Sequence, residues 1–278
     1  MTGKEKRREF KRALETELKE NRKTFIVYSV LRVLVILVMI LQLFNGNYEN
    51  AFLCVLTLVL MIVPSVLQVT FRVEFPSALE IIVLLFIFAA EILGEISSFY
   101  IYFPHWDTVL HTLNGFLCAA LGVSLVEILN KDKRVPFQLS PFFMAMVSFC
   151  FSMTVGILWE FFEFGMDSLF LLDMQKDTVI SQISTTYLDP AKENLRIMFP
   201  EITQTMINNQ VLNIEGYLDI GLIDTMEDLI VNFIGAFVFA VLQYVCAKHG
   251  GKSIFDNLIP FLQEEGKYKQ LDNKIETE

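Results

Sequence analysis

Three carboxylates lie near the end of the apolar stretch 142–164, and their spacing places them together. Glu160, Glu163 and Asp167 stand at positions i, i+3 and i+7. On an α-helix these steps fall on one face over about two turns. A carboxylate inside or at the edge of a hydrocarbon layer is costly, so its default interpretation is functional, with a polar partner. The stretch therefore predicts an acidic functional face.

Three other stretches repeat this pattern of polar side chains at helical spacing. They are Glu91 with Glu95, Asp107 with His111 and Asn114, and Asp224 with Asp228 and Asn232. Within each group the residues are three or four positions apart, so each group shares one helix face. Four such groups in one chain predict a shared polar site.

The predicted site is rich in oxygen ligands and holds no lysine or arginine. Several carboxylates cannot all stay ionised together in a low-dielectric environment, so protons, water or a bound cation must neutralise them. Oxygen ligands with one imidazole suit Mg²⁺, Mn²⁺, Fe²⁺ or Zn²⁺. Such a site could activate water or hold a phosphate-bearing substrate. As metal ligands we predict His111, Glu160, Glu163 and Asp228.

The remaining roles follow from position on the helices. The predicted ligands or acid/base groups are Glu160, Glu163, Asp107, His111 and Asp228. The predicted binding residues are Glu91, Glu95, Asn114, Trp159, Asp167, Asp224 and Asn232. Simpler alternatives stay open: Asp107 and Asp224 begin helices, where Asp is a preferred cap. Trp159 also suits anchoring at the membrane surface, and a lone inward histidine is commonly structural.

The composition indicates a polytopic membrane protein. The 278-residue chain is 54% hydrophobic and 19% charged, which is too apolar for an ordinary soluble domain. Six stretches are long enough to cross a bilayer of about 30 Å; they are residues 24–44, 51–69, 77–95, 108–129, 142–164 and 225–247. We predict an all-α fold with six transmembrane helices in the plasma membrane, with the lipid bilayer as partner.

The distribution of lysine and arginine predicts the orientation. Segment 1–23 and the loop around residues 131–134 are basic, whereas loops 45–50 and 96–106 carry no lysine or arginine. The positive-inside rule then places both chain ends, including the tail 248–278, in the cytoplasm. All four polar groups and the long loop 168–221 would lie at the outer end of the membrane. We expect one or two short interfacial helices in that loop.

Other chemistries lack their motifs. The net charge of −10, without a basic aromatic patch, argues against nucleic acid. No HExxH or GxSxG motif occurs, which excludes zincin proteases and α/β-hydrolases. The four cysteines lack CxxC spacing and lie within apolar spans, as small buried hydrophobes do. Five glycines lie beside the polar groups and predict close helix packing; they are Gly94, Gly115, Gly156, Gly165 and Gly235.

Three motifs carry a family resemblance. They are Trp106-Asp107-x-x-x-His111-x-x-x-Gly115, Trp159-Glu160-x-x-Glu163-x-x-x-Asp167 and Asp224-Thr225-x-x-Asp228-x-x-x-Asn232-x-x-Gly235. They resemble those of the YjdF-type family of bacterial integral membrane proteins, a likeness that supports the polar core without naming a substrate. Asp107, His111, Glu160 or Glu163, Asp228, Asn232 and Gly235 are also similar, more loosely, to the pattern of VanZ-like proteins. VanZ-type proteins are associated with low-level resistance to a lipoglycopeptide antibiotic at the cell surface.

The sequence thus predicts an integral membrane protein with an outward-facing carboxylate and histidine site. We expect a divalent metal there and action on a lipid, a lipid-linked substrate or another cell-envelope precursor. Two alternatives stay open, a cation or proton-coupled transporter and a non-catalytic scaffold or ligand-binding protein. Transport requires polar residues along the whole pathway, and the inner halves of the spans are nearly all apolar.

Overall fold

The computed structural model describes residues 22–71, 73–131, 139–248 and 261–262. They form two compact units. The first consists of residues up to Met153 together with those from Asn232 onward, and the second is Thr154–Val231. The basic segment 1–23 and the tail 248–278 lie almost wholly outside the described residues.

Six helical spans confirm the predicted architecture. They are Lys23–Phe44, Tyr48–Thr70, Ser77–Ile96, Trp106–Val126, Pro141–Phe170 and Leu222–Lys248. Each is long and apolar enough to cross a membrane. Large apolar side chains such as Leu41, Leu158 and Phe161 are exposed on them, as expected for helix surfaces covered by lipid.

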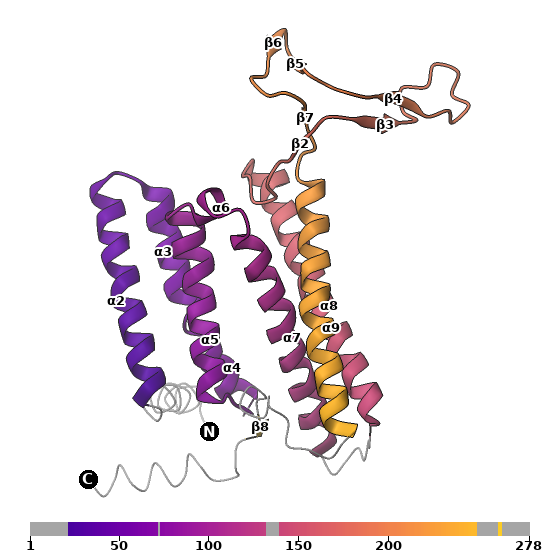
Figure 1. Cartoon of the computed structure of the whole chain (residues 1–278). Coiled ribbons are helices and arrows are strands. Elements are labelled where there is room, and N and C mark those ends of the chain that lie inside the picture. Colours follow the sequence, from indigo (N-terminus) through magenta and orange to yellow (C-terminus); the bar gives the residue numbers. More distant parts are fainter. Residues whose placement is uncertain (1–21, 72, 132–138, 249–260, 263–278) are drawn as a thin grey trace, which may run out of the picture. The chain divides into compact units, whose positions relative to one another are not determined.

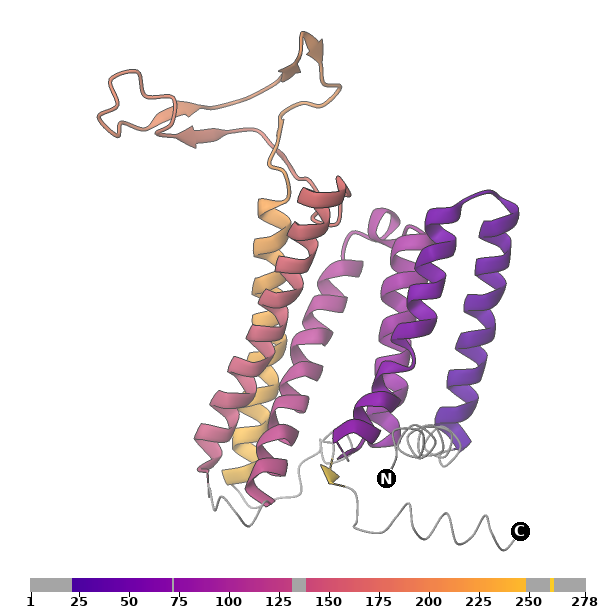
Figure 2. The same cartoon turned by 180° about the vertical axis from the view of Figure 1, so that it is seen from behind.

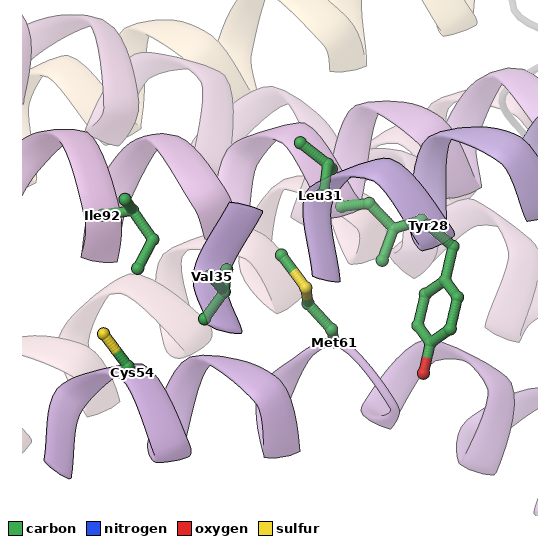
Figure 3. Packing of buried hydrophobic residues seen from close by; sticks show 7 residues of the cluster. Tyr28, Leu31, Val35, Cys54, Met61 and Ile92 are labelled. Atoms are coloured by element: carbon green, nitrogen blue, oxygen red, sulfur yellow. The ribbon is translucent and has the colours of Figure 1, made fainter. Parts of the chain in front are cut away.

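The first unit begins with helix α2 (Arg22–Phe44), which packs against α3 (Tyr48–Leu60) and α5 (Ser77–Phe88) (Figure 1). Buried apolar side chains fill the space between them; Figure 3 labels Tyr28, Leu31, Val35, Cys54, Met61 and Ile92. Lipid tails are as apolar as these side chains, so close packing rather than removal from water holds the helices together.

Two of the spans depart from regular α-helix. The second breaks between α3 and α4 (Val63–Phe71), next to Pro64, whose ring clashes with the preceding turn. The third continues from α5 into a π-helix, η1 (Ala89–Ile96). π-helical turns are rare in proteins, and those that occur often lie at functional sites. Beyond α4, a short strand β1 (Val73–Glu74) pairs with β8 (Phe261–Leu262).

Helix α7 (Trp106–Lys131) follows the short α6 (Phe99–Tyr102) and is the most buried span. Two serines of α8 (Pro141–Phe170) bind its backbone: Ser148 Oγ donates to the Ala119 carbonyl at 2.6 Å and Ser152 Oγ to the Gly115 carbonyl at 2.7 Å. These bonds, both within the first unit, hold α8 against α7.

Glycines let α7 approach α9 (Leu222–Lys248) closely. A Cβ at Gly115 would overlap the carbonyl oxygen of Asn232, and a Cβ at Gly235 would overlap that of Thr112. The predicted close packing at these two glycines is confirmed. Gly165, by contrast, has open space around the position of a Cβ, so the prediction of close packing is wrong there.

The four cysteines, all within the described residues, form no disulfide. Cys54 and Cys118 are buried, as the sequence predicts. Cys150 is exposed and Cys246 is partly exposed, so for these two the prediction of burial is wrong. Both lie on spans, where an exposed face meets lipid and a small apolar side chain is tolerated there too.

The loop of the second unit is made of short antiparallel strand pairs (Figure 2). Strand β2 (Val179–Ile180) pairs with β7 (Tyr217–Leu218), β3 (Ile183–Thr185) with β4 (Ile197–Phe199), and β5 (Met206–Ile207) with β6 (Gln210–Val211). The predicted interfacial helices are therefore wrong. β-Branched and aromatic residues favour strands, and Asn208-Asn209, both with positive φ, form the tight turn of the β5–β6 hairpin.

Candidate functional site

Three carboxylates converge within the second unit. Glu160 and Glu163 lie one turn apart on α8, and Asp228 lies on α9. They are only 5%, 8% and 4% exposed, respectively. One oxygen from each lies within 4.8 Å of the others. Carboxylates this close and this far from water repel one another unless a proton or a cation neutralises them.

Both glutamates turn an oxygen into the protein interior. The Oε2 atoms of Glu160 and Glu163 are buried and accept no hydrogen bond from the described residues, although each residue makes other interactions. Buried charged oxygens normally coordinate metals or accept hydrogen bonds. A set of oxygen ligands alone matches the preference of hard cations such as Mg²⁺, Mn²⁺ or Ca²⁺.

Trp159 contacts this cluster directly. Its indole Nε1 donates a hydrogen bond to Glu163 Oε1 at 2.9 Å. Its ring lies 5.4 Å from the ring of Phe162. The side chain is 41% exposed, so the ring reaches the protein surface while the N–H group is turned toward an acid. The sequence leaves open whether Trp159 is a binding residue or an anchor at the membrane surface. In the structure it contacts Glu163 of the cluster.

A second polar group lies within the first unit. His111 Nε2 is 3.5 Å from Asp107 Oδ1, one turn away on α7. One turn further along, Asn114 Nδ2 donates to Asn232 Oδ1 at 3.3 Å. Asn232 is 1% exposed and also donates to the sulfur of Met153 at 3.6 Å. Within the first unit, these contacts link α7 to α9 and α9 to α8.

Two of the predicted binding residues contact the loop backbone. The carboxylate of Asp167 accepts the backbone N–H groups of Met174 at 2.7 Å and Gln175 at 2.8 Å. The carboxylate of Asp224 accepts the backbone N–H of Lys176 at 2.8 Å. These bonds tie the beginning of the loop to the end of α8 and to the start of α9.

The sequence prediction missed Asp219. Its carboxylate accepts the backbone N–H groups of Thr178 and Ile223, each at 2.7 Å, and of Gly221 at 3.3 Å. Burial acts to raise the pKa of Asp219, but these hydrogen bonds outweigh it and hold the pKa below its usual value. Asp219 therefore caps α9, the role considered for Asp224. An Asp just ahead of an apolar helical run is the signal that could have identified it.

The two acids of η1 stay outside the groups described above. Glu91 is half-buried and Glu95 is exposed. Among the described residues, no group of three or more possible metal ligands includes either of them. The π-helix does contact the start of α7, because Trp106 Nε1 donates to the carbonyl of Ala89 at 3.3 Å.

Comparison with known proteins identifies the family. No curated protein and no solved structure matches the chain. A family model described as "Predicted membrane protein (DUF2238)" matches residues 27–249, a range that includes all three sequence motifs. This is the YjdF-type family, so that resemblance is confirmed, while the likeness to VanZ-like proteins stays a prediction. The chain, whose described residues form six helices long and apolar enough to cross a membrane, belongs to this family of predicted membrane proteins.

Proposed function

We propose that this protein binds a divalent cation through Glu160, Glu163 and Asp228 and uses it on a phosphate-bearing lipid or another cell-envelope precursor. One observation carries the proposal: three buried carboxylates, each offering an oxygen within 4.8 Å of the others. The positive-inside rule, applied to the distribution of lysine and arginine, supports a position of this site at the outer end of the membrane.

The three carboxylates are more stable with a bound divalent cation than as three uncompensated negative charges. Two like charges about 4 Å apart repel by about 4 kcal/mol at the effective dielectric constant of a protein surface, and by more inside. A divalent cation turns this repulsion into attraction, because each carboxylate oxygen becomes a ligand. Mg²⁺ and Mn²⁺ suit an all-oxygen set best, while Fe²⁺ and Zn²⁺ would draw on an imidazole.

A bound cation would supply the chemistry that the carboxylates lack. It can bind a phosphate oxygen, polarise it, or generate a hydroxide from water at neutral pH. Asp107 and His111, which belong to the first unit, keep their proposed role as ligands or acid/base groups. A His111→Gln variant tests that role: loss of turnover with cation affinity retained indicates proton transfer, and loss of both indicates a ligand.

The buried serines do not favour the transport alternative. Ser148 and Ser152 donate their hydroxyls to backbone carbonyls of α7, and Ser124 donates to the carbonyl of Ala120. These hydroxyls are used in joining or bracing helices. Because these three hydroxyls already donate to helix backbone, they lend no support to a path for a transported ion, and we rank transport second.

Metal analysis of purified protein tests the cation. Wild type, Glu160→Gln and Asp228→Asn would be purified in detergent, loaded separately with Mg²⁺, Mn²⁺, Fe²⁺ or Zn²⁺, and dialysed. Glu215→Gln, an exposed position in the loop, serves as the control. We expect about one Mg²⁺ or Mn²⁺ per chain in wild type and in the control, and at least tenfold weaker binding in the two site variants. Equal binding in all four proteins, or none in any, would refute the proposal.

The chemical step needs its own assay. Protein in vesicles containing a polyprenyl diphosphate lipid would be incubated with Mn²⁺ and followed by phosphorus NMR. Loss of the diphosphate signal in wild type but not in Glu160→Gln supports lipid chemistry. Cation-driven proton flux without any change in the lipid would instead establish the transporter alternative.

A further inference from the structure

We propose that Trp159 sets the cation preference of this site by restricting Glu163 to a single ligand oxygen. The inference rests on the proposed function and extends it, because it names the class of cation. The site would select small octahedral cations, Mg²⁺ or Mn²⁺, against Ca²⁺.

The contact between the two residues is well defined. Trp159 and Glu163 are four residues apart on α8, so one helix fixes their separation. The indole N–H is a donor only and cannot itself bind a cation. Its hydrogen bond of 2.9 Å engages Oε1 of Glu163. The centre of the Phe162 ring lies 5.4 Å from that of the indole ring.

This hydrogen bond decides how Glu163 can coordinate. Bidentate binding needs both oxygens of the carboxylate, and the indole competes for the electrons of Oε1. A cation among the three acids therefore meets Glu163 through Oε2, which is buried. Glu160 and Asp228 each have at least one oxygen within 4.8 Å of the other ligand atoms, so the hydrogen bond removes one oxygen from those that the three acids can offer a cation.

Ligand number discriminates between cations. Ca²⁺ takes six to eight oxygens at 2.3–2.6 Å and commonly binds carboxylates through both oxygens. Mg²⁺ requires six ligands at 2.0–2.1 Å, keeps several waters, and is satisfied by a few single-oxygen carboxylates. Removing the indole donor would restore the second oxygen of Glu163 and improve the site for Ca²⁺ in particular.

The other tryptophan of the chain provides a matched control. Trp106 also donates an indole hydrogen bond, at 3.3 Å, and is partly exposed. Its acceptor is the backbone carbonyl of Ala89 and not an acid. Trp106→Phe thus removes the same group from a membrane span while the three carboxylates stay unchanged.

The experiment measures binding of Mn²⁺ by electron paramagnetic resonance, with Mg²⁺ and Ca²⁺ as competitors. The proteins are wild type, Trp159→Phe and Trp106→Phe in detergent, with folding checked by size-exclusion chromatography. We expect the ratio of the Ca²⁺ Kd to the Mn²⁺ Kd to fall about tenfold in Trp159→Phe, the size expected for one hydrogen bond to a charged group. It should change less than about twofold in Trp106→Phe. If Trp159→Phe does not fold, Trp159→Leu removes the same donor.

The outcomes separate this inference from the proposed function. If Trp159 had only a structural role, Trp159→Phe would weaken the binding of all three cations by one common factor. That result, an unchanged ratio of the dissociation constants, would overturn the inference. If Glu160→Gln loses Mn²⁺ while Trp159→Phe keeps the wild-type ratio, the cation site stands and only the role of Trp159 falls. If folded wild-type protein binds none of the three cations, both fall.

Discussion

The carbonyl oxygen of Asn232 lies against the α-carbon of Gly115, so α7 and α9 meet backbone to backbone. The same arrangement recurs between Thr112 and Gly235. With no side chain between the helices, the Asn114 and Asn232 amides come within hydrogen-bond distance. Small residues and polar bonds of this kind hold helices together where lipid removes the hydrophobic driving force.

Adding a methyl group at this contact should separate the helices. We expect Gly115→Ala and Gly235→Ala each to lower the free energy of unfolding by about 1–3 kcal/mol, because the added Cβ has no room. Gly165→Ala is the control: its Cβ meets nothing within 4 Å, and alanine favours helix by up to about 1 kcal/mol. Thermal unfolding in detergent gives the comparison. Equal stability of the Gly115 and Gly165 variants would contradict the close contact.

The Asn114–Asn232 bond predicts an energetic coupling. In a double-mutant cycle with alanine at each position, we expect a coupling free energy of about 0.6 kcal/mol, and at most about 1.7 kcal/mol, as for other hydrogen bonds between membrane helices. Unfolding of the two single variants and the double variant measures it. Strictly additive effects would show that the two amides do not interact in the membrane.

Asp167 should act on the loop and not on cation binding. Its carboxylate holds the backbone N–H groups of Met174 and Gln175. Asp167→Ala should therefore speed hydrogen exchange at these two amides by about tenfold, the effect of one lost hydrogen bond to a charged group. Cation affinity should stay within about twofold of wild type. Loss of the cation in this variant would instead place Asp167 in the site, as its spacing in the sequence predicts.

Acid should loosen the loop through Asp189. Its carboxylate is buried and accepts the backbone N–H groups of Leu195, Ala191 and Glu193. The hydrogen bond from Leu195 leads the effects that hold the pKa of Asp189 below its usual value. A folded pKa below the unfolded value of about 3.9 means that the stabilisation is complete above that pH. It is lost as the pH falls through the folded pKa.

Hydrogen exchange of these three amides measures that loss. Corrected for intrinsic rates, protection should stay level from about pH 8 to about pH 5 and decline below about pH 4. Asp189→Asn keeps a side-chain oxygen but removes the titration, so the acid-dependent part of the protection should disappear. Glu215→Gln, exposed on the same loop, should retain it. An unchanged acid profile in Asp189→Asn would show that another group is responsible.

The spans were predictable because each encodes its own environment. About twenty consecutive apolar residues have one stable place, across a bilayer, whatever their neighbours are. Helical spacing likewise sufficed to place Glu160 beside Glu163, since both lie on one element. The meeting of these two with Asp228 was inferred from repeated spacing and a common depth, and the structure brings the three oxygens together.

What the sequence did not reveal depends on contacts between distant segments. Asp167 and Asp224 bind backbone N–H groups of the loop and not the other acids. Which partner they bind depends on the path by which the loop returns to the helices, and the sequence does not show that path. The strands were missed for another reason: each is two or three residues long, too short for alternation to show. The Asn208-Asn209 turn was the one strong local signal there.

Because of the π-helix Ala89–Ile96, the number of residues in the third span can change without a change in the direction that the following side chains face. The wider turn of this π-helix accommodates one more residue than an α-helical turn does. Deleting a single residue within it would let the segment revert to α-helical winding. In a regular α-helix the same deletion would rotate all following residues by about 100°, the angle that one residue contributes. The third span can therefore lose one residue within Ala89–Ile96 without rotating the part of the helix that follows.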